Sequence, residues 1–232
     1  MKVVILAGGY GTRLSEYTGT IPKPMVPIGG KPIIEHIMDI YSSYGHKEFY
    51  VALGYKGEAI KEYFKNLKKN WKINLIETGS DTLTGGRLKR LEKYLVDENF
   101  LLTYGDGISN IDINKLIEFH NSHKKMITIS AVRPPARFGS LSLQGSDVIK
   151  FKEKKQLGES WINGGFFVVN KSFLKFLNGD DCVLEKEPLE KTTQLKELKA
   201  FRHEGFWQCM DHKLDKDYLE QLIIDKKAPW IK

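Results

Sequence analysis

Glycines and cations follow the first apolar segment of the chain. Residues 3–7 form a short continuous apolar run, which is typical of a buried parallel strand. The residues after it that could bind an anion are three glycines, a threonine and two cations: Gly8, Gly9, Gly11, Thr12, Arg13 and Lys23. Glycines let the backbone turn sharply and bring bare N–H groups close to an anion. A strand, a glycine loop and cations in this order are typical of a polyphosphate site.

Two familiar phosphate motifs do not fit this loop. The dinucleotide fingerprint G-x-G-x-x-G fails because Leu14 stands where its third glycine is required. The P-loop needs a glycine followed by Lys and then Ser or Thr, and that run does not occur here. By itself, the loop could also be an ordinary glycine-rich turn between a strand and a helix.

A second informative stretch directly follows the apolar run 100–104. Asp106 lies there between two glycines, Gly105 and Gly107. Ligands of open α/β sheets bind at the carboxyl ends of the strands, so a carboxylate at this place suits a Mg²⁺ ligand. The alternative is an aspartate that only stabilises a turn.

Two further glycine pairs could lie against a ligand. Thr84, Gly85 and Gly86 precede an amphipathic segment, so they would place backbone N–H groups at a helix N-terminus. Thr84 could equally be a plain N-cap. Asn163 stands before two glycines at the start of the apolar run 166–169, which again allows close approach of a ligand.

Strands and helices are predicted to alternate along the chain. The predicted strands are 3–7, 48–53, 73–76, 100–104, 127–132 and 161–169, with a short apolar strand or edge at 206–211. The predicted helices are 32–41, 58–64, 84–95, 111–122 and 214–225, and helices are expected to fill much of 171–199. This order predicts a single α/β domain, residues 1–232, with a doubly wound, mostly parallel (Rossmann-like) sheet. Residues 141–151 are expected to add a small β-element over that sheet.

Composition narrows the class of protein. The chain has 232 residues and a net charge of +7, but its lysines are scattered and no run of like charges indicates nucleic-acid binding. A positive balance also suits an enzyme with phosphorylated ligands. The two cysteines give no disulfide framework, no apolar run reaches the length of a membrane span, and no signal peptide precedes the first strand. We therefore expect a cytoplasmic protein.

The combined motifs resemble the sugar-1-phosphate nucleotidyltransferase family, over almost the whole chain. G-G-x-G-T-R-L at 8–14 and P-K-P-M at 22–25 mark the wider family. The motifs that resemble its glucose-1-phosphate cytidylyltransferase branch are T-G-G-R-L-K-R at 84–90, T-Y-G-D-G at 103–107, R-F-G at 137–139, N-G-G-F-F at 163–167 and F-W-Q-x-M-D at 206–211. The resemblance implies transfer of a nucleotidyl group, here cytidylyl from CTP, to a sugar 1-phosphate with release of pyrophosphate. It also suggests a homo-oligomer and a role in polysaccharide synthesis.

The resemblance also implies a role for each matching residue. Arg13 and Lys23 would be catalytic and would neutralise the phosphates. The nucleotide would contact Leu6, Ala7, Gly8, Gly9, Gly11, Thr12, Gly85, Arg87 and Asp106. Asp106 and Asp211 would hold Mg²⁺, and the sugar phosphate would contact Gly139, Glu153, Lys154 and Asn163. The small β-element at 141–151 would cover the sugar site.

The chain departs from the family pattern in three places. Lys155 and Cys209 stand where the family has proline, and a stretch that the family usually carries between 64 and 84 is missing. The missing stretch lies beside the nucleotide and subunit contacts in the family, so nucleotide preference, acceptor and oligomeric state stay open. The alternatives are the same chemistry with another nucleotide or another sugar 1-phosphate such as a heptose, a non-catalytic nucleotide-sugar sensor, and a glycosyltransferase.

Overall fold

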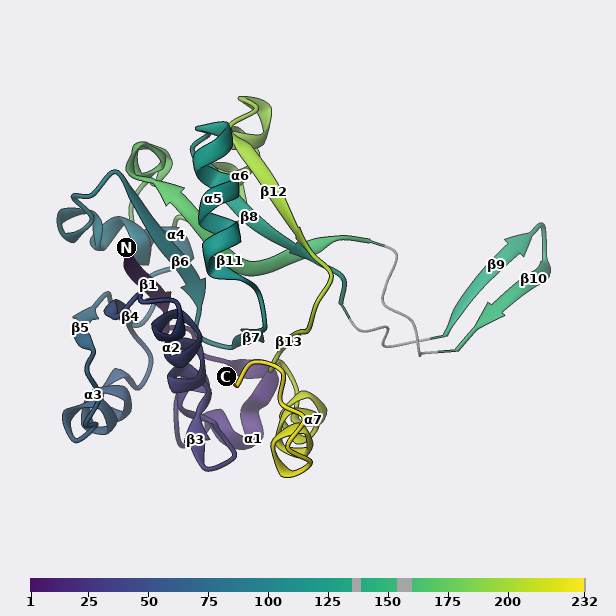
Figure 1. Ribbon diagram of the computed structural model, residues 1–232, viewed down its shortest axis with the longest axis horizontal. Coiled ribbons are helices and arrows are strands. Elements are labelled where there is room, and N and C mark those ends of the chain that lie inside the picture. The colour runs from purple at the N-terminus through teal and green to yellow at the C-terminus, as the bar shows by residue number, and fades with distance from the viewer. Residues whose placement is uncertain (135–138, 154–159, 232) are drawn as a thin grey trace.

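A seven-stranded sheet forms the centre of the molecule (Figure 1). The computed structural model describes residues 1–134, 139–153 and 160–231. In the order β12-β8-β11-β6-β1-β4-β5, the strands are Leu198–His203, Ile127–Val132, Ile162–Asn170, Asn99–Tyr104, Lys2–Leu6, Glu48–Leu53 and Lys72–Glu77. Only β11 runs antiparallel to its neighbours in this sheet. The predicted mostly parallel α/β sheet is therefore confirmed.

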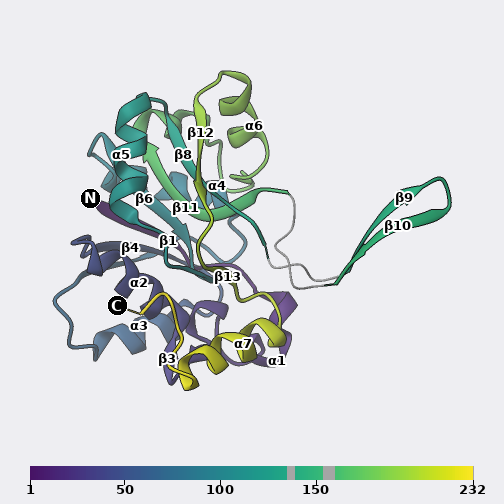
Figure 2. The same cartoon turned by 45° about the vertical axis from the view of Figure 1, so that its right-hand side comes forward.

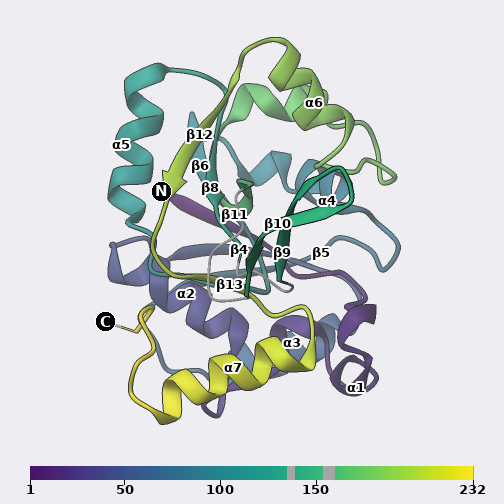
Figure 3. The same cartoon turned by 90° about the vertical axis from the view of Figure 1, so that its right-hand side faces the viewer.

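Strand β1 is buried on both faces, as its continuous apolar run predicted. Val3 and Ile5 point into one hydrophobic cluster, whereas Val4 and Leu6 point into another. The helices that contribute to the first cluster are α2 (Ile33–Ser43), α3 (Gly57–Lys65), α5 (Ile113–His123) and α7 (Lys213–Ile224). Those on the second are α4 (Thr84–Arg90) and α6 (Glu187–Gln194), so the sheet is doubly wound (Figure 3). No helix in the described ranges is both long and apolar enough to cross a bilayer.

Short elements connect β1 to the first long helix. They are η1 (Thr12–Leu14), α1 (Ser15–Thr18), η2 (Lys23–Met25), β2 (Pro27–Ile28) and β3 (Lys31–Pro32). Pro32 precedes α2 as the sequence predicted, because a proline at a helix start loses no hydrogen bond.

The expected helical content of 171–199 is only partly correct. This segment contains the 3₁₀-helix η4 (Lys171–Phe176) and α6, but β12 begins at Leu198 and pairs in parallel with β8. As an edge strand, β12 is mostly half-buried or exposed, so it lacks the continuous apolar run that revealed the central strands. The helix predicted over 84–95 also divides, because α4 ends at Arg90 and η3 covers Glu92–Tyr94.

A small two-stranded sheet joins distant parts of the chain. Strand β7 (Gly107–Ser109) pairs antiparallel with β13 (Trp207–Cys209). The Met210 N–H also donates a hydrogen bond to the Asp106 carbonyl at 2.9 Å. This pairing brings the residues that follow β6 next to those that follow β13.

The predicted small β-element is a hairpin, but its position differs from the expectation. Strands β9 (Ser140–Gln144) and β10 (Asp147–Lys152) pair with each other in a sheet of their own. Figures 1 and 2 show the hairpin extending away from the central sheet instead of covering it. The register places Leu141 opposite Phe151, and both are exposed. The described part of the chain therefore leaves the apolar side of this hairpin without a packing partner.

The packing of α5 on β8 predicts a pH-dependent stability. The Thr128 hydroxyl oxygen lies 2.9 Å from His120 Nδ1 and 2.8 Å from His123 Nε2. His120 is 2% exposed, and burial, with a smaller effect of His123, lowers its pKa from 6.5 to about 4. As the pH falls, the unfolded chain protonates this histidine at a higher pH than the folded chain does. The contribution of neutral His120 to stability is therefore complete above pH 6.5 and disappears as the pH falls towards 4.

We therefore expect the free energy of unfolding to fall by about 2 kcal/mol between pH 7.5 and pH 5 because of His120. Urea denaturation of the wild type and of His120→Gln at both pH values measures this contribution. The variant should show a smaller pH-dependent loss, and an unchanged loss would contradict the assignment.

Candidate active site

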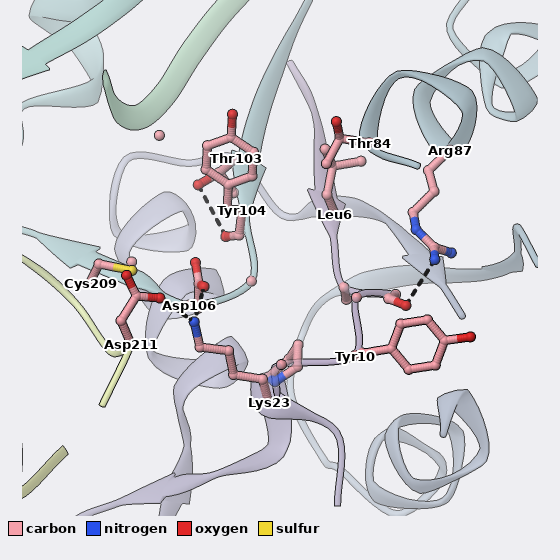
Figure 4. Close-up of a pocket in the computed structure, with 18 of the residues that line it drawn as sticks. Leu6, Tyr10, Lys23, Thr84, Arg87, Thr103, Tyr104, Asp106, Cys209 and Asp211 are labelled. Atoms are coloured by element: carbon pink, nitrogen blue, oxygen red, sulfur yellow. Dashed lines mark hydrogen bonds and ion pairs between the residues drawn. The ribbon is translucent and has the colours of Figure 1, made fainter. Parts of the chain in front are cut away.

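A cavity of about 690 Å³ opens at the carboxyl ends of β1 and β6. Figure 4 shows that its side chains come from the glycine loop, from the end of β6, from α4 and from the segment after β13. The candidate residues from the sequence that line it are Leu6, Ala7, Gly8, Gly9, Gly11, Thr12, Arg13, Lys23, Arg87, Asp106, Asn163 and Asp211. The fold therefore brings together residues from five separate parts of the chain: the N-terminal segment 6–23, α4, the end of β6, β11 and the segment after β13.

Two glycines of the loop are required by their surroundings. Gly11 has a φ of 63°, and a Cβ there would lie 2.9 Å from Lys23 Cβ and from Thr18 Cγ2. A Cβ on Gly8 would lie 2.2 Å from Arg87 Nη1. The loop consequently packs directly against two cationic side chains, which a larger residue would displace.

Lys23 bridges two carboxylates at the floor of the cavity. Its Nζ lies 2.6 Å from Asp106 Oδ2 and 2.7 Å from Asp211 Oδ1, and the other oxygen of Asp211 is 2.7 Å from Arg13 Nη1. Burial disfavours the charged lysine, but the charge of Asp106 and the two hydrogen bonds outweigh it and raise the pKa of Lys23. Lys23 therefore stays protonated at the floor of the cavity.

The same carboxylates fit a hard divalent cation. Asp106, Cys209 and Asp211 each offer an atom, and these atoms lie within 4.8 Å of one another. Burial, together with the charge of Asp106, raises the pKa of the Cys209 thiol, so this sulfur stays a neutral thiol. Carboxylate oxygens suit Mg²⁺ and a protonated thiol does not. The donor set that fits is the pair Asp106 and Asp211.

Arg87, which the resemblance places near the base, lines the cavity but is held by contacts with the protein itself. The residue is 4% exposed. Its guanidinium donates hydrogen bonds of 2.6–3.1 Å to the carbonyls of Gly8, Leu53, Gly79 and Ser80 and to the hydroxyl of Thr78. No carboxylate pairs with it in the described part of the chain, and burial lowers its pKa. The geometry is that of a residue that holds the glycine loop through the Gly8 carbonyl (Figure 4).

Three other candidates among the described residues, Gly85, Gly139 and Glu153, do not line the cavity. The Gly85 N–H donates to the Cys182 carbonyl at 2.9 Å, and a Cβ on Gly85 would lie 2.5 Å from Cys182 Sγ, so this glycine serves packing. Gly139 and Glu153 are described but do not line the cavity. Lys154 lies outside the described residues, as do 137 and 138 of the R-F-G motif.

Sequence reasoning missed several polar residues of the cavity wall. Tyr10 donates to Asp81 at 2.5 Å across the mouth, and Tyr104 and Thr84 both donate to Glu185. Thr84 is therefore not the N-cap, which is Leu83. Tyr104 lies within a motif that the resemblance covered, whereas Glu185 precedes α6 without any local signal. Only the folded chain brings Glu185 to the end of β6.

Comparison with known proteins identifies the family of this chain. The family model described as nucleotidyl transferase matches residues 2–208. A glucose-1-phosphate cytidylyltransferase of Salmonella typhi is 48% identical over 253 aligned residues, covering 99% of this chain and 98% of the relative. That alignment is longer than the 232 residues of this chain, so the relative carries residues that this chain lacks. A D-glycero-alpha-D-manno-heptose 1-phosphate guanylyltransferase of Campylobacter jejuni is 36% identical, covering 86% of this chain and 89% of the relative.

Solved structures agree with the fold. HddC from Yersinia pseudotuberculosis has a TM-score of 0.76 at 30% identity, covering 96% of this chain and 99% of the other. A second structure of the same protein, in complex with GMP-PN, has a TM-score of 0.75. At 19% identity, a putative glucose-1-phosphate thymidylyltransferase from Bacillus anthracis has a TM-score of 0.78, covering all of this chain and 96% of the other, which supports the fold alone.

Proposed function

Because the chain belongs to the nucleotidyl transferase family, we propose that it transfers the cytidylyl group of CTP to glucose 1-phosphate and releases pyrophosphate. The observation that carries this proposal is the cluster of Arg13, Lys23, Asp106 and Asp211 in one cavity beside the glycine loop. The cytidylyltransferase relative, at 48% identity over nearly the whole chain, favours CTP and glucose 1-phosphate. The heptose 1-phosphate guanylyltransferase relatives support the alternative, in which the chemistry is the same and the substrates differ.

The reaction is an in-line displacement at phosphorus. A phosphate oxygen of the sugar 1-phosphate forms a bond to the α-phosphorus of the nucleotide, and the bond to the departing pyrophosphate breaks. Lys23 neutralises the charge of the two phosphates that approach each other, and Arg13 neutralises the triphosphate and the pyrophosphate. The glycine loop holds the nucleotide, so the protein contributes positioning and electrostatic stabilisation instead of a covalent intermediate.

Mg²⁺ is the proposed cofactor. Asp106 and Asp211 would hold it, with phosphate oxygens and water completing the coordination. When bound, the ion would supply positive charge to the phosphates during transfer. Lys23, which contacts both carboxylates, would supply a second positive charge to the phosphates. On the sugar side, Asn163 lines the cavity and is the proposed contact, whereas Gly139, Glu153 and Lys154 are proposed from the family resemblance alone.

Pyrophosphate release tests the proposal. We would assay CTP, UTP, GTP, ATP and dTTP against glucose 1-phosphate, mannose 1-phosphate and a heptose 1-phosphate, with Mg²⁺ and with EDTA. The expected result is release with CTP and glucose 1-phosphate that EDTA abolishes and added Mg²⁺ restores. Release with another pair would support the alternative, and binding of CDP-glucose without any release would identify a nucleotide-sugar sensor.

We also propose a cytoplasmic homo-oligomer. Two unpaired cysteines fit a reducing compartment. A two-stranded hairpin is marginally stable alone, and the exposed apolar side chains on one side of the β9–β10 hairpin are Leu141, Leu143, Val148 and Phe151. A second copy of this chain would cover that side.

Replacing Leu141 and Phe151 together by serine is expected to dissociate the oligomer. Light scattering during size exclusion would show a lower mass for this variant than for the wild type. Lys150→Ser is the matched control, because Lys150 pairs with Ser142 on the other side of the hairpin. A wild type that is a monomer, or a double variant of unchanged mass, would contradict the proposal.

A further inference from the structure

Glu185 places an uncompensated carboxylate in the wall of the cavity. Its two oxygens accept hydrogen bonds from Tyr104 Oη at 2.5 Å and from Thr84 Oγ1 at 2.7 Å. The side chain is exposed and lines the cavity, and none of the ion pairs found among the described residues includes it. A carboxylate in an anion-binding cavity needs an explanation, because it repels phosphates.

Each of the two hydroxyl groups that donate to Glu185 also accepts a hydrogen bond. Asn163 Nδ2 donates to Tyr104 Oη at 3.2 Å, and the Leu184 N–H donates to Thr84 Oγ1 at 2.9 Å. Each hydroxyl therefore accepts one hydrogen bond and must give its own proton to Glu185. The carboxylate is consequently fixed in one orientation.

The fixed carboxylate can still accept more hydrogen bonds. An ionised carboxylate has about four lone-pair positions, and Tyr104 and Thr84 occupy one on each oxygen. Figure 4 shows Tyr104 and Thr84 along the upper edge of the cavity, with Lys23 along the lower edge. The lower edge, with Lys23, suits phosphates. The upper edge, where Tyr104 and Thr84 hold Glu185, therefore suits an uncharged part of the ligand that offers hydrogen-bond donors.

The hydrogen bonds around Glu185 favour the sugar over the base as this donor. Tyr104 stands two residues before Asp106, at the same end of β6, and its hydroxyl is bonded to Asn163 on β11. The Asn163 Oδ1 accepts the Gly165 N–H at 2.8 Å. Its Nδ2 makes one hydrogen bond, to Tyr104, within the described ranges, so the second N–H of the amide can reach a ligand. The amide donor and the carboxylate acceptor thus lie on either side of one tyrosine hydroxyl, a spacing suited to neighbouring hydroxyl groups of a sugar ring.

We propose that Glu185 is a specificity-determining residue, which accepts a hydrogen bond from a hydroxyl group of the acceptor sugar. The inference rests on the proposed function and extends it to a residue outside the expected sugar contacts. Glu185→Gln keeps the size of the side chain and an oxygen for Tyr104, but it loses the charge and one acceptor oxygen. A charged hydrogen bond of this kind corresponds to about 10- to 100-fold in kcat/KM for the sugar 1-phosphate.

The test combines the variant with deoxy sugars. We would measure kcat/KM for glucose 1-phosphate and for its 2-, 3-, 4- and 6-deoxy analogues with CTP, in the wild type and in Glu185→Gln. The expected result is one analogue that lowers kcat/KM in the wild type by about tenfold or more but has little further effect in the variant. The KM for CTP should stay within about twofold. Glu187→Gln is the matched control, because Glu187 is exposed and does not line the cavity.

Other outcomes either overturn the inference or separate it from the proposed function. An equal loss in the variant for glucose 1-phosphate and for every deoxy analogue would make Glu185 a purely structural residue. A loss confined to the KM for CTP would make it a contact of the base. Calorimetric binding of CDP-glucose separates the two proposals: a wild type that binds CDP-glucose without turnover refutes only the proposed function, and weaker binding by Glu185→Gln would then still support the inference. A wild type that shows neither turnover nor binding refutes both.

Discussion

Replacing Lys23 by alanine is expected to lower kcat by about 100- to 1,000-fold and to change KM much less. The Lys23 ammonium lies 2.6 Å and 2.7 Å from oxygens of Asp106 and Asp211, with a side chain that is 10% exposed. Its charge matters most when two negatively charged phosphates come together, so its loss should destabilise the transition state more than the bound substrates. Steady-state pyrophosphate release at saturating CTP and sugar 1-phosphate measures the change.

Lys31→Ala is the matched control for this variant. Lys31 also pairs with a carboxylate, Asp39, at 2.6 Å, but it does not line the cavity. Its replacement should leave kcat within about twofold, because a partly exposed ion pair contributes little. Circular dichroism of both variants would show whether the fold is retained. If Lys23→Ala raised KM and left kcat unchanged, Lys23 would be a binding residue only.

The sequence was most informative where one local pattern identified a residue. Asp106 ends an apolar run between two glycines, and Lys23 follows the glycine loop, so both could be proposed before any fold was known. Their contact could not, because it depends on the parallel pairing of β1 with β6, which joins residues about one hundred positions apart. The core strands were likewise predictable from their apolar runs, whereas the half-exposed edge strand β12 was not.

Residues whose role depends on buried partners were the hardest to interpret. The family resemblance implied that Arg87 lies near the base, yet its hydrogen-bond partners are carbonyls and one hydroxyl of the protein itself. Glu185 gave no local signal, because only tertiary contacts bring it to Tyr104 and Thr84. Motifs identify residue types and spacing, but they do not show which side of a loop a side chain contacts.

Arg87 provides the second large expected effect, on both stability and nucleotide binding. Its five hydrogen bonds link the glycine loop, the end of β4 and the turn at 78–80. A lysine at this place keeps the charge but offers only three donors on one atom, so buried carbonyls lose their partners. We expect Arg87→Lys to lower the free energy of unfolding by about 2–4 kcal/mol and to raise the KM for CTP about tenfold.

Arg90→Lys is the control on the same helix. Arg90 lies one turn beyond Arg87 in sequence, but its side chain is 43% exposed and pairs with Asp180 at the surface. Its replacement should change the unfolding free energy by less than about 1 kcal/mol. Urea denaturation and steady-state kinetics with CTP, UTP and GTP on both variants distinguish the two roles of Arg87. A residue that holds the loop should weaken all three nucleotides by a similar factor and destabilise the fold. A residue that reads the base would instead change the order of nucleotide preference while leaving the stability of the protein unchanged, and that result would restore the role first expected from the sequence.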